Sequence, residues 1–172
     1  DALGKNEIWY VLEAGPDAKI YAGFNREMTA QELYDRCHDG TVAETLNVIH
    51  PRKGDVIYMK PGTVHAAEGG LLIAEIQESS DLTFRLYDWG REFNPATARQ
   101  MHLEEAIDLI DYRRFDEGLY RKGPLWGEED SIQKVTKRIE KKVDVLKADY
   151  YVDKEIFFQE VALYKLSTPQ IM

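Results

Sequence analysis

The most informative segment of this sequence runs from Gly54 to His65 and reads GDVIYMKPGTVH. Its first part, Asp55–Met59, contains β-branched and aromatic side chains and predicts a β-strand. Pro61 and Gly62 then predict a tight turn, because Pro fixes φ and Gly tolerates positive φ. The histidine comes soon after this turn. We therefore expect the segment to present the His65 imidazole from a strand of a β-sheet.

Strands of the same character are expected on both sides of this segment. Clusters of Gly, Pro and charged residues at Gly15–Asp17, Pro51–Gly54 and Glu68–Gly70 separate them and are suited to closing hairpins. The spacing predicts a mainly β protein, either an antiparallel barrel or a sandwich. The predicted strands are Ile8–Glu13, Ala18–Gly23, Thr45–His50, Asp55–Met59, Leu71–Gln77 and Leu82–Tyr87.

Two helices are expected beside these strands. The first spans Thr29–Cys37, where Thr29 and Glu32 have the spacing of a capping box. The second spans Leu103–Asp111 and repeats apolar residues at helical spacing. His102 precedes this helix, and we expect it to cap the helix or to pack against its first turn.

The chain changes character after Tyr112. Residues 113–127 predict a loop, and residues 128–143 are strongly charged. Val143–Val152 and Glu155–Leu166 again predict strands, which either begin a second sheet or extend the first. We therefore divide the chain into a barrel, residues 1–111, and a C-terminal part, residues 112–172, with a helix and strands.

Composition limits the classes of function. The chain has 172 residues, 44% hydrophobic and 31% charged, which is enough apolar material for one well-buried core. Its net charge of −9 disfavours nucleic acid and anionic membranes as partners, because like charges repel. A single cysteine, Cys37, and no apolar stretch of membrane-spanning length predict a cytoplasmic protein. The chain lacks an initiator methionine, and we expect natural sequence before Asp1.

Lys5, Glu7 and His65 are the first candidate site residues. Side chains alternate along a strand, so Lys5 and Glu7 lie on the same face. A Glu and a His on neighbouring barrel strands are suitable ligands for zinc or a similar metal. Each feature also has a simpler interpretation, since a Lys–Glu pair is usually a surface ion pair and a lone His is more often structural.

Polar residues are also frequent between Glu75 and Arg91. Glu75 and Gln77 share one face of a predicted strand, and Thr83, Arg85 and Tyr87 share one face of the next. A barrel lined in this way has a polar, hydrated interior. Such an interior favours a binding site.

Three motifs resemble type I phosphomannose isomerase in their order and spacing: Lys5-x-Glu7, the turn Gly62-Thr63-Val64-His65, and Ser80-Asp81-x-Thr83-x-Arg85-x-Tyr87-Asp88. The resemblance covers residues 4–110. It implies a cupin fold, which is a jelly-roll type of antiparallel β-barrel, with zinc in the barrel. It also implies interconversion of mannose 6-phosphate and fructose 6-phosphate, two sugar phosphates.

The resemblance assigns roles to individual residues as well. Glu7 and His65 correspond to two of the family's four zinc ligands, and the other two, a Gln and a His, are expected from sequence upstream of Asp1. Arg85 corresponds to the family's catalytic arginine. The residues that correspond to polar groups of its substrate cleft are Lys5, Glu75 and Asp81.

The implied reaction moves a proton between adjacent carbons and develops negative charge on the sugar oxygens. Zinc and Arg85 could hold that charge, and a pre-placed cation contributes on the order of 3 kcal/mol. Glu75, Asp81, Lys5 and a metal-bound water all qualify for the proton transfer. Arg85 could instead pair with Asp81 or Glu75 and only fill the barrel.

Two other functions stay open. A non-catalytic cupin module would keep Glu7 and His65 and bind a sugar phosphate or another small anion. A metal-dependent cupin oxygenase or epimerase is disfavoured, because the chain lacks the usual cluster of several histidines on two neighbouring strands.

Overall fold

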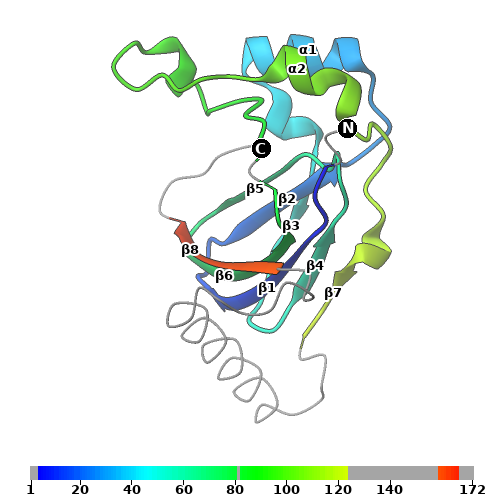
Figure 1. Cartoon of the computed structure of the whole chain (residues 1–172), viewed down its shortest axis with the longest axis vertical. Helices are drawn as coiled ribbons and strands as arrows, with labels where there is room; N and C mark the ends of the chain where they lie inside the picture. Colours follow the sequence, from blue (N-terminus) through cyan, green and yellow to red (C-terminus); the bar gives the residue numbers. More distant parts are fainter. Residues whose placement is uncertain (1–3, 81, 124–158, 167–172) are drawn as a thin grey trace.

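The computed structural model describes residues 4–80, 82–123 and 159–166, which form mainly two antiparallel β-sheets (Figure 1). The larger sheet has the strand order β7-β4-β1-β6-β8, and the smaller has the order β3-β2-β5. Neighbouring strands within each sheet run antiparallel. The strands are β1 (Glu7–Ala14), β2 (Lys19–Phe24), β3 (Leu46–Ile49), β4 (Val56–Met59), β5 (His65–Glu68), β6 (Leu71–Glu78), β7 (Tyr120–Arg121) and β8 (Gln159–Leu166).

An apolar core joins the two sheets. Residues two apart on a strand project to the same face, so Trp9 and Val11 of β1 point together towards the smaller sheet. There they share one buried cluster with Ile20 and Ala22 of β2. This packing of two antiparallel sheets confirms the predicted mainly β, cupin-like fold.

α1 (Ala30–Asp39) and α2 (Leu103–Ala106) lie together at one end of the sheets (Figure 1). The predicted cap of the first helix is confirmed, since Thr29 Oγ1 accepts a hydrogen bond from the Glu32 N–H at 3.1 Å. The second helix is shorter than predicted, because the chain tightens into a 3-10 turn after Ala106. The 3-10 helices are η1 (Val42–Thr45), η2 (Arg91–Phe93), η3 (Ile107–Leu109) and η4 (Glu117–Leu119).

The first five predicted strands are confirmed to within one residue at each end, but Leu82–Tyr87 is not a strand. The reason lies in β6, which pairs with β1 along one edge and with β8 along the other. No edge of β6 is therefore left for the segment that follows it. Leu86 and Tyr87 instead pack into an apolar cluster with Leu33 of α1.

β7 and β8 both extend the larger sheet, through pairing with β4 and β6. The buried Asp55 carboxylate holds the β7 region by accepting hydrogen bonds from the Tyr120 hydroxyl (2.6 Å) and the Gly123 N–H (2.7 Å). The division of the chain at residue 111 stays a prediction. The predicted charged stretch 128–143 and the predicted strand Val143–Val152 lie outside the described residues. Within the described ranges, no helix is both long and apolar enough to cross a membrane.

Candidate functional site

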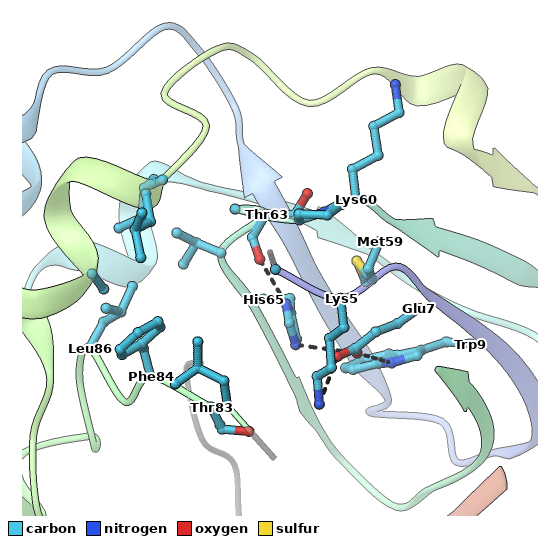
Figure 2. Close-up of a pocket in the computed structure, with 18 of the residues that line it drawn as sticks. Lys5, Glu7, Trp9, Met59, Lys60, Thr63, His65, Thr83, Phe84 and Leu86 are labelled. Carbon is cyan, nitrogen blue, oxygen red and sulfur yellow. Dashed lines mark hydrogen bonds and ion pairs between the residues drawn. The ribbon is translucent and has the colours of Figure 1, made fainter. Parts of the chain in front are cut away.

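A cavity of about 390 Å³ lies between the sheets and α2 (Figure 2). This volume is within the range of about 300 to 1,000 Å³ that is usual for small-molecule sites. One side of its lining is polar and the opposite wall is largely apolar. The polar and charged lining residues are Lys5, Glu7, Lys60, Thr63, His65, Glu75 and Thr83. The apolar wall includes Leu82, Phe84, Leu86, Ala106, Leu109 and Ile110.

Glu7 is the polar residue at the centre of this lining. It begins β1 and is only 4% exposed, because the strand directs its side chain inward together with that of Trp9. Its Oε1 lies 3.1 Å from Lys5 Nζ, and its Oε2 accepts a hydrogen bond from Trp9 Nε1 at 3.3 Å (Figure 2). The Glu7 carboxylate is therefore held in one orientation.

His65 faces Glu7 from the neighbouring sheet. Its Nδ1 lies 2.8 Å from the backbone oxygen of Thr63, and because that oxygen only accepts, Nδ1 carries the proton in this contact. Nε2 is then free to donate a lone pair, and it points at Glu7 Oε2 from 3.9 Å (Figure 2). The ring also meets the edge of Trp9, with 5.2 Å between ring centroids.

The turn before His65 depends on Gly62. This residue has φ of 80°, and a Cβ there would lie 2.6 Å from the carbonyl oxygen of Leu109. The Gly62 carbonyl in turn accepts a hydrogen bond from the Asp111 N–H at 2.9 Å. Glycine at this position therefore lets the turn pack against residues 109–111, which helps to place His65 on β5.

The surroundings of Glu7 favour its ionised form. Burial by itself raises the pKa of the Glu7 carboxyl. The electrostatic interaction with His65, a hydrogen bond with Glu75 and the ammonium group of Lys5 act in the opposite direction, and the net effect lowers the pKa of Glu7 below its usual 4.5. At neutral pH Glu7 is a carboxylate suited to binding a cation.

Glu7 and His65 lie close enough to approach one metal ion. Bonds from zinc to His nitrogen and carboxylate oxygen are about 2.0 to 2.2 Å long, so two ligand atoms on a tetrahedral ion lie about 3.4 Å apart. The observed separation of 3.9 Å is about 0.5 Å longer, so the two side chains would have to move slightly closer to bind one ion. In the described part of the chain, no group of three or more His, Cys, Asp and Glu side chains could hold a metal.

Lys5 and Glu75, two of the three predicted substrate residues, both line the cavity. Lys5 Nζ donates a hydrogen bond to Gln77 Oε1 at 2.5 Å in addition to its contact with Glu7. Glu75 is 8% exposed and stands opposite Trp9 in the β1–β6 pair. Asp81, the third predicted substrate residue, lies outside the described residues. The substrate roles of all three stay predictions.

Arg85 lies beside the cavity but does not line it. Its neighbours Phe84 and Leu86 are wall residues, whereas its own Nη1 donates a hydrogen bond to the Gln100 carbonyl at 3.0 Å. Its Nε is buried, and none of the residues that the structure describes forms a hydrogen bond with it. The structure thus brings Lys5, Glu7, Glu75 and His65 together and leaves Arg85 at the edge, where its catalytic role stays a prediction.

The contacts of two residues near Arg85 were not predicted from the sequence, which led us to expect His102 to cap α2 or to pack against its first turn. His102 stands at the N-cap position of α2, yet its side chain makes no cap hydrogen bond and instead accepts one from the Arg85 N–H at 3.1 Å. Asp88 is fully buried and accepts hydrogen bonds from Arg91 and Arg99. Asp88 belongs to a motif quoted in the sequence analysis, but nothing local in the sequence identifies Arg91 and Arg99 as its partners.

Comparisons with known proteins find mannose-6-phosphate isomerases among the relatives of this chain. Mannose-6-phosphate isomerase ManA of Bacillus subtilis (strain 168) is 38% identical to this chain over 109 residues, which are 63% of this chain and 34% of that protein. Mannose-6-phosphate isomerase of Streptococcus mutans is 37% identical over 108 residues, again 63% of this chain and 34% of that protein. This chain therefore spans about a third of the length of the curated relatives that it matches.

A structural comparison points to the same group. The crystal structure of mannose 6-phosphate isomerase from Bacillus subtilis superposes with a TM-score of 0.59 and 32% identity, and covers 66% of this chain and 36% of that one. No family model matches the chain. The resemblance predicted from the three motifs is confirmed by these relatives.

Proposed function

We propose that this chain, a relative of the type I phosphomannose isomerases, forms part of a metal-dependent site that interconverts mannose 6-phosphate and fructose 6-phosphate. One observation carries this proposal: the Glu7 carboxylate and His65 Nε2 face each other at 3.9 Å on the wall of a cavity of small-molecule size. They come from the two motifs that correspond to the family's zinc ligands. The sequence similarity to named mannose-6-phosphate isomerases supports the substrate class.

In this proposal Glu7 and His65 hold a zinc ion. Thr63 supports His65 by fixing the tautomer that leaves Nε2 free, and Trp9 and Lys5 hold the Glu7 carboxylate in place. When bound, zinc would polarise oxygens of the sugar as a Lewis acid. Glu7 and His65 supply two donors, and a tetrahedral ion needs further ligands beyond these two.

The polar groups around this pair bind and orient the sugar phosphate. Lys5 reaches the cavity from just before β1 and Glu75 reaches it from β6, so they can contact oxygens on different carbons of one sugar. Asp81 completes this set in our proposal. Holding adjacent carbons against fixed polar groups lowers the barrier, because the orientation entropy is lost on binding rather than in the reaction step.

Arg85 stabilises the negative charge that develops on the sugar as the proton moves between adjacent carbons. Its hydrogen-bond partner at Nη1 is the neutral carbonyl of Gln100, so that contact leaves the guanidinium charge uncompensated. A cation at the cavity edge favours an enediolate over the neutral sugar. To touch the sugar, the Arg85 side chain has to leave Gln100 and turn towards the wall formed by Phe84 and Leu86.

The test measures zinc content and the conversion of mannose 6-phosphate to fructose 6-phosphate by the natural gene product and its variants. We expect Glu7→Gln and His65→Gln to lose bound zinc and turnover, because a neutral amide is a weaker zinc ligand than a carboxylate or an imidazole. Glu13→Gln and His38→Gln are matched controls, since both residues are exposed and lie away from the cavity lining. Arg85→Ala should retain zinc and convert mannose 6-phosphate much more slowly, with a residual rate that can still be measured.

Two results would count against the isomerase. Equal zinc binding by Glu7→Gln, His65→Gln and the controls would show that this pair does not hold the metal. A protein that binds mannose 6-phosphate without converting it would be a non-catalytic module. We also propose a cytoplasmic location, because the single cysteine, Cys37, is a free buried thiol that suits a reducing compartment.

A further inference from the structure

We propose that His102 is the positioning residue that sets the location of Arg85 and of the cavity wall beside it. This inference rests on the proposed isomerase, in which Arg85 acts on the sugar. His102 is not among the residues that line the cavity. It therefore acts through Arg85 rather than on the substrate.

Two opposed hydrogen bonds join His102 to the backbone of Arg85. The Arg85 N–H donates to His102 Nδ1 at 3.1 Å, and the His102 N–H donates to the Arg85 carbonyl at 2.8 Å. This arrangement resembles a bridge between antiparallel strands, with an imidazole nitrogen in place of one carbonyl oxygen. Residues 82–86 belong to neither sheet, so these bonds hold Arg85 where a strand ladder does not.

His102 also connects this backbone to two other parts of the cavity wall. Its carbonyl accepts the first hydrogen bond of α2, from the Ala106 N–H at 3.1 Å. Its ring meets Phe84 edge-on, with 6.1 Å between centroids and an interplanar angle of 68°. Phe84 and Ala106 both line the cavity. A displaced His102 would therefore shift the wall together with Arg85.

An ion pair between the buried Asp88 and the partly exposed Arg99 lies in the segment between Arg85 and His102. Asp88 accepts a hydrogen bond from Arg99 Nε at 2.9 Å and closes the loop between them. The carbonyl of the next residue, Gln100, accepts a hydrogen bond from Arg85 Nη1. His102, two residues further along the chain, accepts the hydrogen bond from the Arg85 N–H. The same loop thus holds the backbone of Arg85 and also contacts its guanidinium, which has to leave Gln100 to reach the sugar.

The test compares two His102 variants that differ in the position of their side-chain hydrogen-bond acceptor. Asn places an amide oxygen near the position of Nδ1, whereas Gln places its polar atoms nearer the position of Nε2. We expect His102→Asn to keep most of the turnover of mannose 6-phosphate and His102→Gln to lower kcat by about 10- to 100-fold, with a smaller change in KM. His38→Gln, on the exposed face of α1, is the matched control.

A double-mutant cycle separates positioning from general stability. If His102 acts through Arg85, His102→Gln should lower kcat in the wild-type background and have no further effect in Arg85→Ala. Thermal unfolding of each variant checks that it is folded. Should His102→Gln fail to fold, His102→Asn alone decides the point, because full loss of kcat in a folded His102→Asn would contradict the acceptor role.

Two further outcomes would overturn the inference while leaving the isomerase in place. Equal kcat for His102→Gln and wild type would show that the bond to Arg85 does not matter, and additive losses in the double mutant would show that His102 acts independently of Arg85. Absence of turnover by the wild-type protein is a different result. It would overturn the isomerase itself and the inference with it.

Discussion

The substitution Gly62→Ala tests whether the turn before His65 packs closely against residues 109–111. Gly62 has φ of 80°, and a left-handed conformation costs alanine about 1 to 2 kcal/mol. The new Cβ would also lie 2.6 Å from the Leu109 carbonyl oxygen and 3.1 Å from the Asp111 nitrogen, which are backbone atoms that cannot turn away. Overpacking of this kind costs about 1 to 3 kcal/mol. We expect Gly62→Ala to lose about 2 to 4 kcal/mol of unfolding free energy.

Gly70→Ala is the matched control for this change. Gly70 has φ of 74°, close to that of Gly62, but a Cβ there would meet nothing within 4 Å. The control carries the conformational cost without the clash, and alanine also lowers the entropy of the unfolded chain by about 0.4 to 1 kcal/mol in both variants. The difference between the two variants therefore isolates the contact with residues 109–111. We expect that difference to be about 1 to 3 kcal/mol.

Urea denaturation followed by circular dichroism measures both variants, with an unchanged slope as the check that only stability has changed. Zinc titration supplies a second readout, because Gly62 precedes His65 by three residues and a displaced turn moves Nε2 away from Glu7. Gly62→Ala should bind zinc more weakly than Gly70→Ala. Equal denaturation midpoints for the two variants would refute the close packing of this turn.

Two further predictions concern buried carboxylates outside the cavity. Asp55→Ala should lower the unfolding free energy measured by urea denaturation by about 2 to 4 kcal/mol. The reason is that Asp55 accepts three hydrogen bonds, two of them from the β7 region. A loss no larger than that of the control Asp17→Ala, in an exposed turn, would contradict this prediction. Burial raises the pKa of Asp88, but hydrogen bonds from Arg99 and Arg91 outweigh it and lower the pKa below its usual 3.8. A lowered folded-state pKa gives stability that is present above the unfolded value and is lost as pH falls through the folded value. The difference in unfolding free energy between wild type and Asp88→Asn should therefore be constant above about pH 5 and shrink below pH 3.8. A difference that grows on acidification would show that folding raises the pKa of Asp88 instead of lowering it.

Much of the site was predictable because its members belong to short motifs. Lys5 and Glu7 are two residues apart and share a face of one strand, and the turn residues before His65 predict where that strand begins. The resemblance to a known family connected these two motifs. Their contact could not be read from either motif alone, because Glu7 and His65 lie on different sheets.

The pattern of the sequence by itself determined the alternating strands, the cap at Thr29 and the turn at Gly62, since each depends on residues only a few positions apart. The tertiary structure decided which segments occupy the edges of the larger sheet. β8 takes the edge of β6, so the segment around Arg85 leaves the sheet and takes His102, 17 residues away, as its partner. Several segments of a chain can pair with the same strand edge, and local sequence does not determine which of them does. The pairing is set only when the whole chain packs.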